Sequence, residues 1–168
     1  MAEPGAADEL LRRALSYPYA APARSYLYRD GEAAELPPGG PELAGRTSLL
    51  SYGANAAPEA LARKLAPLSE AETPVLRAEL GGFDVAYSAH VSLYGAVPAT
   101  LVESAGAVAP VSVVFPTAEQ LRLLTATEHG NYDLVELDGL DCRLEGGGEV
   151  VEAMAYLSRR GTLSVDGG

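Results

Sequence analysis

The sequence predicts an α+β fold in which a mixed, curved or barrel-like β-sheet is accompanied by a few short helices. Five or six segments have the pattern of β-strands, two or three have the pattern of helices, and the two kinds do not alternate strictly. The length of 168 residues suits one domain of ordinary size with an appendage. We therefore expect an N-terminal arm over residues 1–45, a main domain over residues 46–160 and a C-terminal tail over residues 161–168.

The N-terminal arm is expected to hold one helix and one short strand. Apolar residues recur at helical spacing over residues 8–17, which predicts an amphipathic helix that ends before Pro18. A strand is expected over residues 25–28, and the proline- and glycine-rich stretch at residues 36–41 can continue neither element. The arm could form a lid, an extra strand or a dimer contact, so a homodimer is one arrangement we consider.

The main domain is expected to open with a strand over residues 47–51, a turn over residues 53–55 and a helix over residues 58–65. The glycine-rich segment 145–149 is expected to be a hairpin turn, because a phosphate-binding loop would need a following helix and basic partners. Another turn is expected at residues 138–141. Further strands are expected where the apolar pattern is that of a sheet, at residues 83–87, 99–102, 111–115, 133–137 and 150–157.

Another well-marked helix is expected after Thr117. The segment that starts there has the pattern of a capping box, and His129 followed by glycine predicts where the helix ends. At about 100° per residue, Leu121, Leu124 and Glu128 fall on one stripe of this helix. The pattern therefore predicts a carboxylate on the face that packs against the core.

Two interpretations of Glu128 follow from this pattern. Burial and the negative end of the helix dipole would both raise the pKa of its carboxyl group, which suits general acid–base chemistry. Alternatively, the helix ends at Thr125, because Thr125 and Thr127 are weak helix formers, and Glu128 then lies in a solvated loop. The helical pattern by itself does not decide between them.

Composition and charge argue against several classes of partner and site. The formal net charge of −11 repels phosphate backbones and anionic lipids, and no apolar run approaches bilayer length, so nucleic-acid and membrane partners are not expected. One cysteine, Cys142, and two histidines argue against a disulfide, a metal site or a cofactor. The first five residues lack the pattern of a secretory signal, so we expect a cytoplasmic protein. Eleven arginines to one lysine and abundant alanine indicate a GC-rich, bacterial genome.

The segment Ser51-Tyr52-Gly53-Ala54-Asn55 resembles the Tyr-Gly-Ser-Asn signature of the γ-glutamyl cyclotransferase-like family, and it lies, as there, between a first strand and a helix. The resemblance covers about residues 47–157 and implies the fold of that family. Further features follow in the family's order, namely Leu80–Val85, Gly95 with residues 99–101, the strand at 111–115, the helix that delivers Glu128, Tyr132, the strand containing Glu136 and the strand at 153–156.

This chain departs from the family's pattern at three places. Ala54 stands where the signature has serine, and Thr125 stands where an aspartate often precedes the glutamate by three. The span from Glu128 to Tyr132 is shorter than in classical cyclotransferases. These departures bear on the substrate more than on the fold.

The resemblance implies an amine-releasing cyclotransferase, of the transferase or lyase type, that acts on a small γ-glutamyl substrate without a cofactor or metal. The α-amine of the substrate attacks its own side-chain carbonyl, closes 5-oxoproline and expels an amine. Glu128 would be the catalytic acid and base. The backbone N–H groups of Gly53–Asn55 would hold the substrate carboxylate or the developing oxyanion, and Tyr52 and Tyr132 would hydrogen-bond the substrate or Glu128.

The same residues also have ordinary structural roles to fill. Asn55 could cap the helix that follows it, and the two tyrosines could be core residues whose hydroxyls reach the rim. A non-catalytic member of the same fold is therefore the alternative function. In it, the pocket binds a small amino-acid-like ligand, or the arm recruits a protein partner. Glu128 favours the enzyme, whereas Ala54 and the shorter span favour the alternative.

Overall fold

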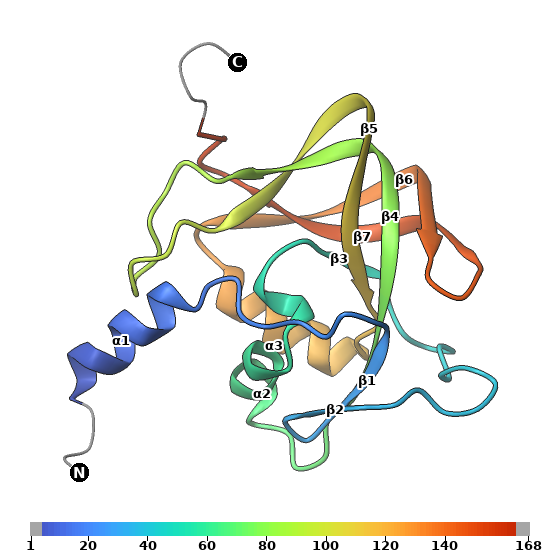
Figure 1. The fold of residues 1–168 in the computed structure, drawn as a ribbon, viewed down its shortest axis with the longest axis horizontal. Coiled ribbons are helices and arrows are strands. Elements are labelled where there is room, and N and C mark those ends of the chain that lie inside the picture. Colours follow the sequence, from blue (N-terminus) through green and yellow to red (C-terminus); the bar gives the residue numbers. More distant parts are fainter. Residues whose placement is uncertain (1–4, 164–168) are drawn as a thin grey trace.

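The chain forms three α-helices and seven β-strands within residues 5–163, the part that the computed structural model describes (Figure 1). The helices are α1 (Ala6–Leu15), α2 (Pro58–Leu65) and α3 (Ala118–Glu128), and a one-turn 3₁₀ helix covers Ala54–Ala56. The strands are β1 (Tyr26–Arg29), β2 (Glu32–Ala34), β3 (Leu49–Ser51), β4 (Glu72–Tyr87), β5 (Ala99–Val114), β6 (Tyr132–Leu144) and β7 (Glu149–Ser158).

The sheet closes on itself. Its strand order is β2-β1-β4-β5-β3-β7-β6, and β6 pairs in addition with β4, so β3 to β7 form a closed ring. Neighbouring strands are antiparallel except β3 and β7, which run parallel. The predicted α+β class, with a mixed and barrel-like sheet and few short helices, is confirmed. The strand expected in the arm is β1, and it pairs with β2 and with the first residues of β4.

The two strands expected at residues 99–102 and 111–115 are one strand, and the prediction of two was wrong. β5 runs unbroken from Ala99 to Val114 and pairs with β4 along most of its length. The pairing shifts register between Gly81 and Phe83, which is where the long pair bends around the ring. The exposed stretch in the middle of β5 breaks the apolar pattern, so the sequence suggested two strands where the backbone makes one.

The first half of β4 was not predicted because both of its faces are buried. Residues 73–76 are all buried, so the period-two alternation that marks a half-exposed strand is absent. Leu76 belongs to the core cluster inside the ring, while Val75 belongs to the cluster under the helices. At the other end of this strand, Tyr87 is 64% exposed.

Two cores hold the fold together. One cluster draws buried residues from all five ring strands and none from a helix, and it therefore fills the inside of the ring. The second cluster lies between the outer face of the sheet and the pair α2 and α3, to which Leu61, Leu65 and Leu124 contribute. Figure 1 shows α2 and α3 side by side below the sheet, with α1 apart from them. This second core positions the ends of both helices beside the loop after β3.

The capping box predicted at Thr117 is present, and the helix it opens continues to Glu128. The Thr117 hydroxyl accepts a hydrogen bond from the Gln120 N–H at 3.3 Å, and the Gln120 side chain accepts one from the Thr117 N–H at 2.9 Å. The Thr125 hydroxyl donates to the Leu121 carbonyl at 2.8 Å, one turn earlier, as threonines inside helices do. The interpretation in which the helix ends at Thr125 is wrong.

Of the two turns predicted around β6, one is present and one is not. Residues 145–148 form the expected turn between β6 and β7. The turn expected at residues 138–141 is wrong, because β6 continues through it with an irregular register between Asp138 and Cys142. In the described part of the chain, no helix is long and apolar enough to cross a bilayer. The N-terminal residues 1–4 and most of the tail, residues 164–168, lie outside the described range.

Candidate functional site

A cavity of about 280 Å³ lies where the arm, the loop after β3, α2 and the end of α3 meet. Its walls come from segments that are far apart in the sequence. They include every residue that the sequence predicted for the site, namely Tyr52, Gly53, Ala54, Asn55, Glu128 and Tyr132. The loop and the carboxylate therefore face one space.

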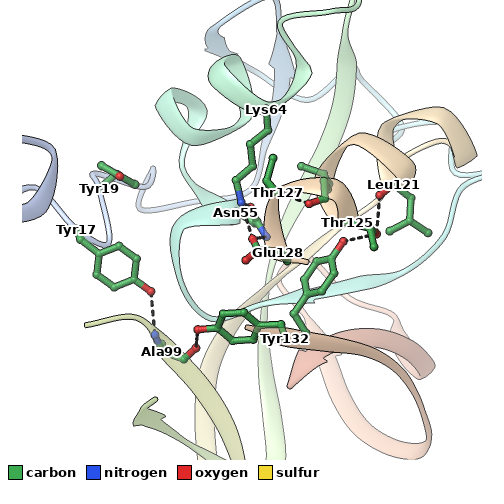
Figure 2. A network of polar contacts seen from close by, with 12 residues as sticks. Tyr17, Tyr19, Asn55, Lys64, Ala99, Leu121, Thr125, Thr127, Glu128 and Tyr132 are labelled. Atoms are coloured by element: carbon green, nitrogen blue, oxygen red, sulfur yellow. Dashed lines mark hydrogen bonds and ion pairs between the residues drawn. The ribbon is translucent and has the colours of Figure 1, made fainter. Parts of the chain in front are cut away.

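Glu128 is the last residue of α3, and its side chain is 18% exposed. Its Oε1 accepts a hydrogen bond from Lys64 Nζ at 2.5 Å and another from Asn55 Nδ2 at 3.2 Å. Lys64 Nζ also donates to Asn55 Oδ1 at 2.7 Å, so the three side chains close a small network (Figure 2). No residue within 5–163 donates a hydrogen bond to the second carboxylate oxygen, Oε2.

Asn55 does not cap the following helix, so that structural interpretation is wrong. The residue before α2 is Ala57, and no side chain caps that helix end. The Asn55 amide instead presents its oxygen to Lys64 and its nitrogen to Glu128. It thereby holds the carboxylate and the ammonium group in a set orientation.

Lys64 was missed by the sequence analysis, although it is the one lysine in the chain. It lies on α2, and its side chain is 15% exposed. Its spacing contains a usable signal, because it stands four residues after the buried Ala60 and three after the buried Leu61, on the core-facing stripe of the helix. Its ammonium group places a positive charge beside the Glu128 carboxylate, a partner that the sequence had not predicted.

The loop after β3 is shaped by the arm. At Gly53 a β-carbon would lie 2.9 Å from the hydroxyl oxygen of Tyr17, so only glycine lets the arm approach this closely. The Tyr17 hydroxyl accepts a hydrogen bond from the Ala99 N–H at 2.9 Å, which attaches the arm to the start of β5. Across the described residues, the N–H groups of Gly53, Ala54 and Asn55 donate to no protein acceptor.

The tyrosine hydroxyls around the cavity are committed to protein partners. Tyr132 donates to the Ala99 carbonyl at 2.8 Å, and Tyr52 donates to the Tyr156 carbonyl. Burial raises the pKa of Tyr17 and Tyr156 to about 12, and it also raises the pKa of Tyr52 and Tyr132. The four hydroxyls therefore stay protonated at neutral pH.

The arm supplies a wall of the cavity that the sequence analysis did not assign. Tyr17 and Tyr19 reach the cavity from the segment after α1, as Figure 2 shows, and Arg13 of α1 lines it as well. Tyr19 is buried against Ala57 and Ala60 at the start of α2. The arm is thus packed onto the candidate site itself.

One cluster of acidic groups lies outside the cavity. Glu136 and Asp138 of β6 and Glu152 of β7 bring carboxylate oxygens within 4.8 Å of one another. All three side chains are exposed, as acidic residues on neighbouring strands commonly are. Nothing beyond their proximity favours a metal ion there.

Comparisons with known proteins bear on the fold and not on the chemistry. No protein-family model matches the chain, and no curated protein matches it. Among solved structures, it is similar to the solution structure of a protein from Arabidopsis thaliana, with a TM-score of 0.50 and 17% sequence identity. The similarity covers 74% of this chain and 71% of the plant protein. At this identity the two chains share an architecture, and the likeness carries no statement about substrate.

Proposed function

We propose that this protein is an amine-releasing γ-glutamyl cyclotransferase in which Glu128 moves the protons. The observation that carries the proposal is that Glu128 and the Gly53–Asn55 loop line the same small cavity, and that the three N–H groups of this loop donate to no protein acceptor among residues 5–163. Acid–base catalysis needs a positioned carboxylate, and a tetrahedral intermediate needs fixed N–H donors. Residues that could supply both border one cavity.

The proposed reaction closes a ring within the substrate. The α-nitrogen forms a bond to the γ-carbonyl carbon, and the bond from that carbon to the departing amine breaks. Two protons leave the α-ammonium group, and two protons reach the departing nitrogen, which is released as an ammonium ion. Glu128 transfers these protons, and the loop N–H groups stabilise negative charge on the carbonyl oxygen. Because the reaction is intramolecular, the enzyme can lower much of the activation barrier by holding the substrate in a bent conformation, with its α-amine against its own γ-carbonyl carbon.

The network around Glu128 gives each neighbour a part in this scheme. Lys64 and Asn55 both bind Oε1, which leaves Oε2 for the substrate ammonium group. The carboxylate acts first as a base and takes a proton from the substrate ammonium group. Once protonated, the same carboxyl group acts as the acid for the departing amine.

A non-catalytic binding protein is the second candidate function. Two observations favour it: Ala54 offers no hydroxyl at the signature position, and the carboxylate is already paired with Lys64. In this case the cavity binds a small amino-acid-like ligand through the same groups. The ligand then leaves unchanged.

The test is to incubate purified protein with a panel of γ-glutamyl amines and to assay 5-oxoproline. Glu128→Gln keeps the side-chain shape and is expected to lower kcat by about 10²- to 10⁴-fold, the usual contribution of an acid–base group. Glu136→Gln, at an exposed glutamate away from the cavity, is the matched control and should retain activity. Equal rates for Glu128→Gln and wild type would refute the role of Glu128. Ligand binding without product would favour the second candidate.

A further inference from the structure

The loop that lines the cavity carries no hydroxyl of its own, and the arm places one beside it. Ala54 stands where the signature of the γ-glutamyl cyclotransferase-like family has serine, so the loop Gly53–Asn55 offers no side-chain hydroxyl. Tyr17 of the arm lines the same cavity as this loop. Tyr17 and Ala54 also pack against one small cluster of buried residues, which holds the arm onto the start of α2.

Two close contacts fix the Tyr17 hydroxyl at the wall of the cavity. Its oxygen accepts a hydrogen bond from the Ala99 N–H at 2.9 Å, and a β-carbon at Gly53 would lie 2.9 Å from the same oxygen. Gly53 and Ala99 both line the cavity. Figure 2 shows the Tyr17 ring reaching from the arm toward Ala99. The hydroxyl therefore lies against the loop whose N–H groups have no protein acceptor in the described part of the chain.

The proton of the Tyr17 hydroxyl is not used by the protein within residues 5–163. The hydrogen bond that this hydroxyl makes is one that it accepts, from the Ala99 N–H. The hydroxyls of Tyr52 and Tyr132 differ from it, because each donates to a backbone carbonyl. Burial raises the pKa of Tyr17 to about 12, so the group remains a donor at neutral pH. Tyr17 therefore has a proton to offer to an acceptor oxygen in the cavity.

We infer that the Tyr17 hydroxyl, beside the N–H groups of the loop, donates a hydrogen bond to the γ-carbonyl oxygen of the substrate. The arm would thereby supply the hydroxyl that Ala54 lacks. The identity of this oxygen rests on the proposed function. Tyr17 precedes the part of the chain that carries the family resemblance, so a residue of the arm becomes part of the reaction site.

The hydrogen bond contributes to the rate because the charge on this oxygen changes during the reaction. When the α-nitrogen bonds to the γ-carbonyl carbon, the π electrons of the carbonyl move onto its oxygen. Tyr17 keeps its proton throughout, and its hydrogen bond to the negatively charged oxygen is stronger than its bond to the neutral carbonyl. When the bond to the departing amine breaks, the carbonyl re-forms and the hydrogen bond weakens again.

The kinetic test is Tyr17→Phe, assayed for release of 5-oxoproline from γ-glutamyl amines. A donor that acts mainly in the transition state should lower kcat by about 10²-fold when removed, with KM nearly unchanged. Tyr28→Phe is the matched control, because it removes a hydroxyl from a buried tyrosine of β1 that is not among the residues lining the cavity. It should retain the kcat of wild type. Equal kcat values for Tyr17→Phe and wild type would overturn the inference.

Binding separates loss of the donor from loosening of the arm, since the Tyr17 hydroxyl also attaches the arm to β5. The Kd values of glutamine and methionine sulfoximine are measured by calorimetry on Glu128→Gln, which slows turnover, with and without Tyr17→Phe. Circular dichroism first verifies that both variants are folded. Glutamine presents a planar carbonyl, whereas the sulfoximine presents an oxygen on a tetrahedral centre, as the intermediate does. Loss of the donor should weaken binding of the sulfoximine about tenfold or more and that of glutamine less than about twofold.

The binding result can be told apart from a failure of the proposed function. Wild type that releases no 5-oxoproline would refute the proposed function, yet selective weakening of the sulfoximine by Tyr17→Phe would still support the hydroxyl as a donor to a ligand oxygen. A loosened arm would weaken both compounds equally. That result, or no detectable binding of the sulfoximine to Glu128→Gln, would overturn the inference, whatever the activity.

Discussion

Replacing Lys64 by methionine tests whether the ion pair with Glu128 forms in solution and stabilises the fold. Lys64 Nζ and Glu128 Oε1 are 2.5 Å apart, and the two side chains are 15% and 18% exposed. Solvent therefore has limited access to both charged groups. Methionine keeps the length and packing of the lysine stem and removes the charge. The Glu128 carboxylate then retains Asn55 as its one hydrogen-bond donor among the described residues.

The magnitude follows from the degree of burial. Leaving one partner of a fully buried pair uncompensated costs roughly 3–5 kcal/mol, and exposed pairs contribute about 0–1 kcal/mol. For a pair that is mostly but not fully buried, we expect Lys64→Met to lower the free energy of unfolding by about 2 kcal/mol. Removing both charges with Lys64→Met and Glu128→Gln should bring the loss back below about 1 kcal/mol, because no unpaired charge remains.

Urea unfolding followed by circular dichroism measures these differences. With a slope of roughly 2 kcal/mol per molar urea, the single variant should shift the midpoint by about 1 M. Arg143→Met removes an exposed pair with Asp141, whose side chains are 65% and 56% exposed, and should change stability by less than about 0.5 kcal/mol. If Lys64→Met behaved like this control, or if the double variant lost the sum of the single losses, the ion pair would not be coupled as described.

Three further predictions follow from the packing of the arm, the helix cap and the buried tyrosines. Gly53→Ala places a β-carbon 2.9 Å from the Tyr17 hydroxyl oxygen, so the arm should shift and trypsin should cleave it faster. Adding Tyr17→Phe should restore resistance, and equal cleavage of wild type and Gly53→Ala would contradict the contact. Thr117→Ala removes the cap of α3 and should cost about 1 kcal/mol, or roughly 2–4 °C in Tm, so an unchanged melting curve would refute it. Burial raises the pKa of Tyr17 and Tyr156 to about 12, whereas an unfolded tyrosine titrates near roughly 10. The contribution of these two protonated hydroxyls to the free energy of unfolding is therefore complete below about pH 10 and is lost as the pH rises towards about 12. Urea midpoints that stay constant from about pH 8 to 11.5 would show that these hydroxyls are not buried.

Local patterns in the sequence predicted much of the fold. The bounds of α2 matched the prediction, and the capping box of α3 was visible because caps depend on residues three apart. The first half of β4 was not visible, since burial on both faces removes the alternation that marks a strand. The long bent pair of β4 and β5 was read as separate pieces for a related reason: its exposed middle interrupts the apolar pattern.

In the candidate site, too, the sequence predicted only the residues that a local pattern marks. The periodicity of α3 placed Glu128 on an inward stripe, and the segment around Gly53 and Asn55 was marked by its own residues. Lys64, on the neighbouring helix α2, carried a weaker signal of the same kind. Arg13, Tyr17 and Tyr19 of the arm carried none, because nothing local distinguishes a residue that will line a cavity from one that will face solvent.

The sequence alone determined which helices form and that Glu128 falls on the same helical stripe as Leu121 and Leu124, because these depend on neighbours within one or two turns. The sequence left open whether α3 ends at Thr125 or reaches Glu128, and the structure decided it. Only the tertiary structure decided what that carboxylate meets. Asn55 and Glu128 are 73 positions apart, and Lys64 and Glu128 are 64 apart, so their contact depends on how the closed ring packs the two helices against one another. Closure of the sheet and packing of α2 against α3 bring these groups together, and no local spacing encodes either event.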